Sequence, residues 1–221
     1  MSEGPPNPVV VERNIISTAG WIAVVAVLVQ SVAHLANIGF DADIMQLNAD
    51  EEHNVFAWAS SVSTFAAALF LFVPAVAAGK LDRVTAAMSG ALTFLSLDDA
   101  LSIHERIAER SVDVLDTEIS LERVVWPVVY LPLLVFVFVI LLRMARARPG
   151  PASTALRLGL LLLVAAVVAE LTSALYVEDS DLGTWPDARE VTIEEGAELA
   201  GWILIAGALA ARAYLLGEGK E

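Results

Sequence analysis

The chain has 221 residues, 57% of them hydrophobic, with a formal net charge of −14 and a mean hydropathy of +0.67. This composition excludes an ordinary soluble domain, and the absence of cysteine excludes disulfides, thiolate metal sites and cysteine nucleophiles. Six apolar segments reach the roughly 20 residues with which a helix crosses a bilayer. We therefore predict an all-α, polytopic integral membrane helical bundle with six transmembrane helices. The predicted spans are residues 18–38, 55–78, 84–104, 124–146, 154–177 and 194–216.

Basic residues indicate on which side of the membrane each predicted loop lies. If the loops alternate from an N-terminus inside, the inner segments hold nine of the 13 basic residues but five of the 27 acidic ones. Short cytoplasmic loops are typically rich in Lys and Arg. We therefore expect residues 1–17 and 217–221 to be cytoplasmic tails of a transmembrane domain over 18–216. The acidic loops should face the periplasmic or extracellular side of the inner (plasma) membrane.

The first predicted span is too long for the core of a signal peptide, and it carries His34 near its outer end. A single histidine on an apolar helix is more often a hydrogen-bonded core residue than part of a site. The acidic loop that follows contains Glu52 and His53. We interpret Glu52 as a solvated loop residue, whereas His53 fits a loop histidine and a ligand equally well. The next turn, between the second and third spans, is short, which predicts antiparallel neighbours.

The third predicted span changes from apolar to polar near its end. A continuous helix would place Asp98, Ser102 and Glu105 on one stripe. Asp99 and His104 would then lie on flanking faces, so that these side chains would not all point to one place. Burial of such acids without partners would leave them neutral, which itself describes a proton-binding site.

Residues 105–123 alternate charged and apolar residues, which predicts an amphipathic helix on the outer surface. The fourth span begins with Trp126 and Tyr130. Tryptophan and tyrosine are enriched where a helix meets the membrane surface. We therefore expect both rings to lie in an interfacial belt.

The last two spans carry four further acids near their outer ends. Glu170 lies about two turns from the end of the fifth span, and Glu194, Glu195 and Glu198 open the sixth. Acids in a first helical turn complement the helix dipole, which explains Glu194 and Glu195 better than Glu198. Alternation of the spans brings all of these acids to the same level as the polar end of the third span.

Carboxylates with one or two imidazoles suit divalent ions such as Zn, Fe or Mn. Metal sites in helical bundles also combine Glu from several helices with His, although the Glu-x-x-His spacing is absent here. We therefore predict a divalent metal ion as cofactor. The expected ligands are Asp98, His104, Glu105, Glu170, Glu194 and Glu198. Further candidates are Asp99, Glu195, His53, Glu52 and His34.

The reaction stays open at this point. A metalloenzyme would activate water at the outer interface, with a spare carboxylate as general base. The alternatives are a proton- or cation-coupled transporter or channel, and a non-catalytic subunit of a larger membrane complex. The inner halves of the spans are nearly free of polar residues, which favours a site open to one face over a path through the membrane. The expected partners are the lipid bilayer and other membrane subunits or further copies of the chain, with no nucleic acid.

Three polar stretches together resemble a group of uncharacterised bacterial membrane proteins with six helices. The stretches are Glu52-x-Asn54 with Trp58-x-Ser60-Ser61, Leu95-Ser96-Leu97-Asp98-Asp99 with His104-Glu105, and Glu194-Glu195-x-x-Glu198-x-x-Gly201. That group usually has Glu at the position of Asp99, and a Pro where this chain has Val55-Phe56-Ala57. The resemblance covers most of the spanning region. It implies the architecture and the choice of site residues, not an activity.

Overall fold

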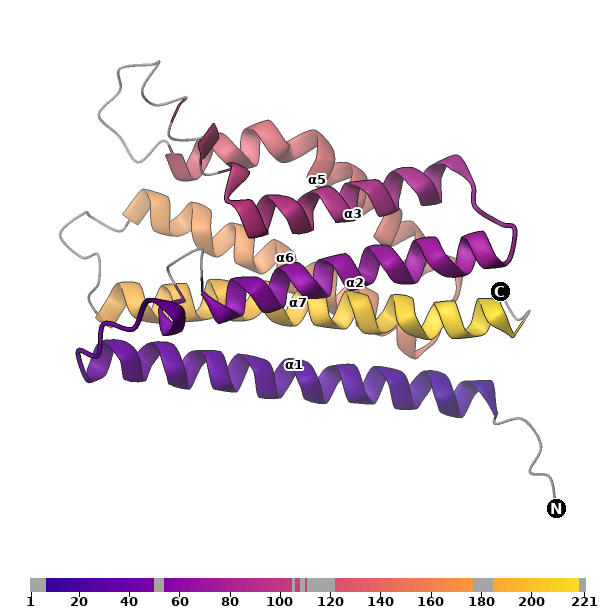
Figure 1. Cartoon of the computed structure of the whole chain (residues 1–221), viewed down its shortest axis with the longest axis horizontal. Helices are drawn as coiled ribbons and strands as arrows, with labels where there is room; N and C mark the ends of the chain where they lie inside the picture. The colour runs from indigo at the N-terminus through magenta and orange to yellow at the C-terminus, as the bar shows by residue number, and fades with distance from the viewer. Residues whose placement is uncertain are drawn as a thin grey trace.

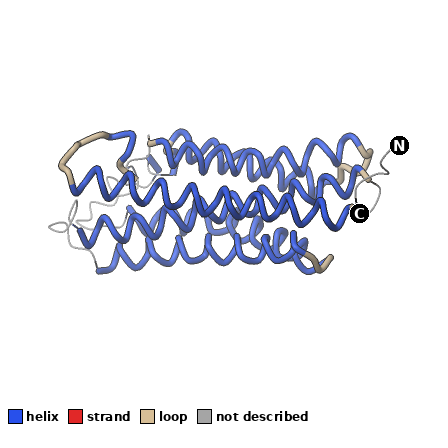
Figure 2. Tube along the Cα trace, turned by 90° about the horizontal axis from the view of Figure 1, so that it is seen from below, coloured by secondary structure: helices blue, strands red, loops and turns tan. Residues whose placement is uncertain are grey.

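The computed structural model describes most of the chain. The described residues are 7–49, 54–104, 106–107, 110, 122–176 and 185–218. Within these ranges the chain is helical, with no strand (Figure 2). The elements are α1 (Pro8–Gly39), the 3-10 helix η1 (Met45–Leu47), α2 (Val55–Ala77), α3 (Arg83–Leu101), α5 (Glu122–Ala147), α6 (Pro151–Tyr176) and α7 (Trp185–Gly217).

The long helices lie side by side along the long axis of the molecule, and consecutive helices run in opposite directions (Figure 1). One end of the bundle, which we call the Pro8 end, holds the start of α1 and the end of α7. The opposite end, which we call the Trp185 end, holds the start of α7 and the ends of α3 and α6. The most extensively packed helix is α7, which contacts α1, α2 and α6. The predicted antiparallel pairing of the second and third spans is confirmed by the packing of α2 against α3.

Side-chain caps explain where three of the helices begin. Asn7 accepts a hydrogen bond from the backbone N–H of Val9, and Asn54 accepts two from the start of α2. Asp82 accepts one from the N–H of Thr85 at 2.7 Å, and this bond lowers the pKa of the Asp82 carboxyl. Such caps satisfy N–H groups that have no partner within the helix.

Five of the long helices are long and apolar enough to cross a membrane, whereas α3, with 19 residues, is not among them. Its Asp98 and Asp99 lower its hydropathy at the Trp185 end. Large apolar side chains also cover the outside of the bundle, as on α1, which exposes Trp21 and Leu28. These features are those of a multi-pass membrane protein.

Helix bounds differ from the predicted spans chiefly at α1 and α7. α1 begins at Pro8 rather than at residue 18, and α7 begins at Trp185 rather than at residue 194. The added N-terminal part of α1 is held in the bundle, because the buried Glu12 accepts a hydrogen bond from the N–H of Ala152 at the start of α6. Apolarity marks the part of a helix that suits lipid, and a helix continues beyond that part where tertiary contacts hold it.

The Pro8 half of the bundle has a dry core. Fully buried side chains from four helices fill it, namely Met88, Leu92, Leu141, Leu156, Ile205 and Leu209. Beyond this core, Arg212 donates to the carbonyl of Met144 at 2.6 Å, and Arg157 donates to that of Ala145 at 3.2 Å. These bonds satisfy carbonyl groups at the C-terminal end of α5.

Helices α6 and α7 cross closely where both carry glycine. A Cβ on Gly159 would lie 2.8 Å from the carbonyl oxygen of Gly201, and a Cβ on Gly201 would lie 2.9 Å from Leu163. Small residues allow this backbone contact, which is a common means of helix association in membranes.

We expect Gly159→Ala to lower the free energy of unfolding by about 1–3 kcal/mol, because the added methyl forces the two backbones apart. Gly90→Ala on α3 is the matched control. A Cβ there meets nothing within 4 Å, so that it should be neutral or stabilise by about 0.5–1 kcal/mol through helix propensity. Thermal unfolding in detergent measures both variants. Equal effects at the two positions would contradict the close crossing.

Candidate functional site

A cavity of about 180 Å³ lies inside the bundle, toward the Trp185 end. Helices α2, α3, α5, α6 and α7 all contribute to its wall. The ionisable groups of the wall are six acids, one histidine and one tyrosine. They are Asp98, Asp99, His104, Tyr130, Glu170, Glu194, Glu195 and Glu198. Among the described lining residues there is no Lys or Arg.

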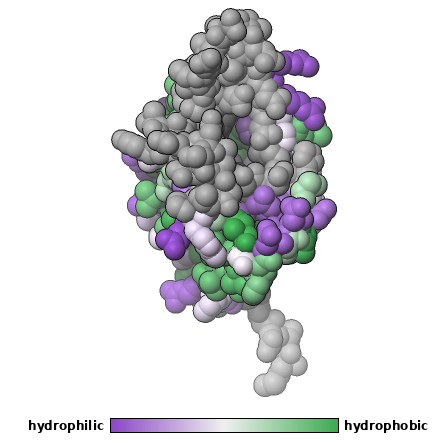
Figure 3. All heavy atoms as spheres, turned by 90° about the vertical axis from the view of Figure 1, so that its left-hand side faces the viewer, coloured by the Kyte–Doolittle hydropathy of each residue, from purple (hydrophilic) through white to green (hydrophobic). Residues whose placement is uncertain are grey.

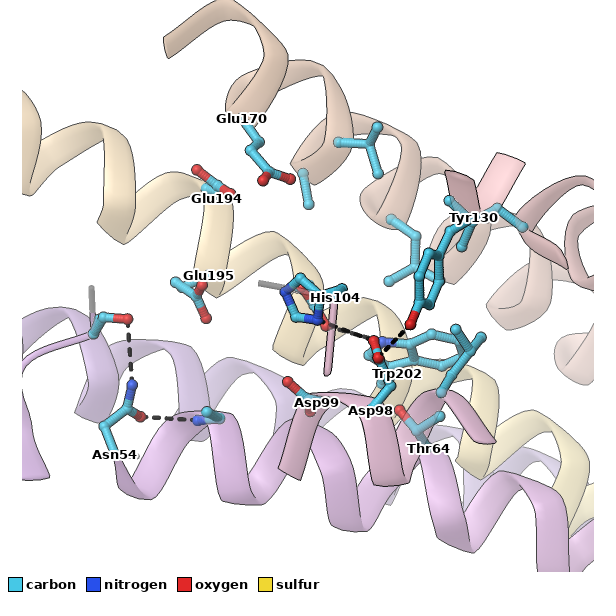
Figure 4. A pocket seen from close by; sticks show the side chains of 18 residues that line it. Asn54, Thr64, Asp98, Asp99, His104, Tyr130, Glu170, Glu194, Glu195 and Trp202 are labelled. Atoms are coloured by element: carbon cyan, nitrogen blue, oxygen red, sulfur yellow. Dashed lines mark hydrogen bonds and ion pairs between the residues drawn. The ribbon is translucent and has the colours of Figure 1, made fainter. Parts of the chain in front are cut away.

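Asp98 is the most tightly held acid of the cavity. It is 5% exposed, and its Oδ1 accepts a hydrogen bond from the Tyr130 hydroxyl at 2.5 Å. Its Oδ2 lies 3.0 Å from Nδ1 of His104 (Figure 4). Because a carboxylate oxygen accepts, this pairing places the hydrogen on Nδ1, which leaves Nε2 as the basic nitrogen of the neutral ring. A histidine held in this way is a suitable metal ligand or proton acceptor.

The approach of His104 to Asp98 depends on Ser102. α3 ends at Leu101, and Ser102 adopts the left-handed conformation with φ 49° and ψ 47°. The chain therefore does not continue as one helix, and His104 turns back toward Asp98. The prediction that His104 and Asp98 lie on different faces is wrong, because it assumed an unbroken helix through Ser102.

Asp99 and Glu198 are held by donors from neighbouring helices. Ser61 of α2 donates to Oδ2 of Asp99 at 2.6 Å. Ser60 of α2 and the indole N–H of Trp202 both donate to Oε1 of Glu198 at 3.2 Å. These bonds join α2, α3 and α7 around the cavity. The donors in these three bonds are all neutral groups.

The remaining glutamates lie across the cavity from the aspartates. Figure 4 shows His104 between Asp98 and Asp99 of α3 on one side and Glu194 and Glu195 of α7 on the other. Glu194 experiences electrostatic repulsion from Glu170 and Glu198. Acids this close at low dielectric are not all ionised unless a cation is present. The cavity is therefore suited to take up protons or a cation.

The predicted metal ligands are brought together only in part. His104, Glu170, Glu194 and Glu198 line the cavity together with Asp98, but within the described residues no three His, Asp or Glu are arranged to hold a metal ion. Asp98 already uses both oxygens to hold Tyr130 and His104.

Three of the predicted site residues, Glu52, His53 and Glu105, lie outside the described residues. His34 is described and is not among the lining residues. Its ring is 1% exposed, and Nδ1 accepts a hydrogen bond from the N–H of Ala49 at 2.9 Å. It thus fixes the loop after α1, in agreement with its interpretation as a core histidine.

At the Trp185 end, hydrophilic side chains lie beside hydrophobic ones among the described residues (Figure 3).

The comparison with known proteins adds one finding. The family described as Domain of unknown function (DUF8692) matches residues 19–212, a range that includes α2, α3, α5 and α6 and most of α1 and α7. The chain belongs to this family. No curated protein and no solved structure matches the chain. The description of DUF8692 names no activity.

Sequence reasoning missed two aromatic residues of the DUF8692 chain that line the cavity. Tyr130 was expected in an interfacial belt, but it is 5% exposed and donates to Asp98. Trp202 follows Glu198 by four residues, the spacing at which helix side chains meet, and this spacing could have identified it. No comparable signal existed for Tyr130, since its partner is on another helix.

We expect the conformation of Ser102 to control the Asp98–His104 pair. Ser102→Gly should preserve it, because glycine adopts positive φ without strain, whereas Ser102→Val should disrupt it at a cost of about 1–3 kcal/mol. NMR of ¹⁵N-histidine-labelled protein reports the hydrogen-bonded Nδ1–H of His104, with the variant His104→Gln to assign its signal among the three histidines. An unchanged His104 signal in Ser102→Val would refute this dependence.

Proposed function

We propose that this integral membrane protein binds a cation in the cavity, and that the cation is a divalent metal ion such as Zn, Fe or Mn. One observation carries the proposal: six carboxyl groups and an imidazole line the cavity, with no Lys or Arg among the described lining residues. Hydrogen bonds from Ser, Tyr and Trp orient these acids but leave their charge in place. A divalent cation compensates this charge directly.

The residues that would hold the metal are His104, Glu170, Glu194 and Glu198, with Asp98 orienting the ring of His104. When bound, the metal would polarise a water molecule or a small substrate, and a spare carboxylate could accept the proton. With such a metal ion bound, the protein would be a membrane metalloenzyme. The dry core between the cavity and the Pro8 end supports binding or chemistry over passage of an ion.

We further propose that α3 crosses the membrane with the other five helices and that the Pro8 end is cytoplasmic. Basic residues gather at this end, as the positive-inside rule requires. They are Arg13, Lys80, Arg83, Arg143, Arg146, Arg148, Arg157 and Arg212. The cavity would then lie in the outer half of the bundle, toward the periplasmic or extracellular side.

Purified protein loaded with Zn²⁺, Mn²⁺ or Fe²⁺ and then desalted should retain at least one of these metals at one equivalent per chain. Glu198→Gln and His104→Gln should each weaken its affinity at least tenfold, because each removes a ligand while keeping a side chain of similar size. Elemental analysis and competition with a chelator measure the two quantities.

Glu218→Gln is the matched control, because Glu218 is exposed at the Pro8 end. Thermal unfolding identifies any variant that has lost its fold. Substoichiometric metal in the wild type with all three ions would overturn the metal assignment, as would affinities that the two site variants leave unchanged.

The absence of cysteine allows the topology to be tested with single-cysteine variants. In intact cells, a membrane-impermeant thiol reagent should label Ala42→Cys, in the loop after α1, but not Ala78→Cys, between α2 and α3. Both alanines are exposed, so accessibility in detergent should be equal. Labelling of Ala78→Cys alone in cells would show the opposite orientation.

A further inference from the structure

The cavity wall combines two kinds of side chain. The acids and His104 described above make up its polar part. The wall also contains aliphatic side chains from α3, α5 and α6. They are Leu95, Leu134, Leu163, Ala166 and Val167. A site for a hydrated ion alone has no use for such a wall, whereas a ligand with a hydrocarbon part does.

Leu95 and Leu134 belong to two helices that contact each other little. Among the described residues, α3 and α5 share far fewer contacts than α2 and α3, or α5 and α6. Phe94 of α3 stacks on Tyr130 of α5, with ring centroids 5.9 Å apart and an interplanar angle of 27°. Phe94 is 41% exposed on the apolar outside of the bundle, while Tyr130 is 5% exposed and lines the cavity. The two stacked rings therefore span the distance from the apolar surface to the cavity.

The acids of the wall determine which charge the head group of the ligand carries. Six acids repel an anion and attract a cation. They are spread around the wall, and no three of the described groups are arranged for a metal ion. Such a wall suits a cation whose charge is diffuse. Tyr130 and Trp202 add two aromatic rings to it, and aromatic rings with carboxylates are the groups that bind alkylammonium ions.

We propose that the cavity takes the ammonium head of an amphiphile, which enters from the lipid phase between α3 and α5 where Phe94 and Tyr130 meet. The head group would lie among Asp99, His104 and Glu198, and the hydrocarbon chain would extend past Leu134 into the bilayer. A volume of about 180 Å³ accommodates a head group but not a whole lipid, so that the hydrocarbon chain would remain outside the cavity. The inference rests on the proposed cation site and names a second class of cation for it, which would compete with a metal ion.

Photoaffinity labelling in lipid nanodiscs tests the ligand class. The probe is a dodecyl trimethylammonium with a diazirine beside the head group, compared with a dodecyl carboxylate and a butyl trimethylammonium that carry the same diazirine. We expect the dodecyl ammonium to label Leu134 itself saturably, as located residue by residue by fragment mass spectrometry, with at least tenfold less labelling in Glu198→Gln. Zn²⁺ should reduce this labelling if the metal binds as proposed. The carboxylate probe should label only side chains exposed to lipid, such as Leu131.

The entrance is tested by the rate of labelling. Phe94→Ala should accelerate labelling inside the cavity at least threefold, and Phe94→Trp should slow it. Leu97→Ala, which changes another exposed side chain of α3, should leave the rate unchanged. If the butyl and dodecyl ammonium probes labelled the cavity equally, and the Phe94 variants did not change the rate, entry from the lipid phase would be overturned but the cation site would be retained. If the carboxylate probe labelled the cavity as strongly as the dodecyl ammonium probe, the preference for a cation would be overturned. If neither ammonium probe labelled the cavity, the proposed ligand class would be overturned. The metal proposal is decided separately, by metal retention.

Discussion

A carboxyl group inside an apolar helical bundle costs free energy unless hydrogen bonds and opposite charge compensate it, and this cost organises the Trp185 half of the molecule. Each of the three best-held acids recruits neutral donors from a different helix: Asp98 from α5, Asp99 from α2, and Glu198 from α2 as well as its own helix. The hydrogen bonds orient the acids and tie the helices together. Their charge remains to be compensated, and that requirement is the physical basis of a cation or proton site.

The position of α7 makes this convergence possible. Glu194, Glu195 and Glu198 lie in its third and fourth turns, and the helix packs against α1, α2 and α6 at once. Close contact with α6 depends on Gly159 and Gly201, where larger side chains would separate the two backbones. The glycines at the crossing of α6 and α7 thus allow the acids of α7 to reach the centre of the bundle.

Apolar segment length predicted the long helices that the described residues form, and alternation predicted that the described acids lie near the same end of the bundle, because both follow from periodicity and chain direction. The pairing of His104 with Asp98 could not be predicted, since it depends on a positive φ at Ser102 that hydropathy does not encode. Tyr130 was assigned to the interface for a related reason: its burial is decided by a partner on another helix. The metal geometry stays a prediction, because Glu105 is not described and the described acids surround the cavity without converging.

The two halves of the bundle constrain function in opposite ways. The Trp185 half holds charge around an open volume, whereas the Pro8 half is closed by fully buried Leu92, Leu141 and Ile205. A cation that reached the cavity would meet a hydrocarbon barrier toward the Pro8 end, and crossing such a barrier without polar partners is strongly unfavourable. The arrangement therefore favours a bound cation that acts within the membrane over one that passes through it.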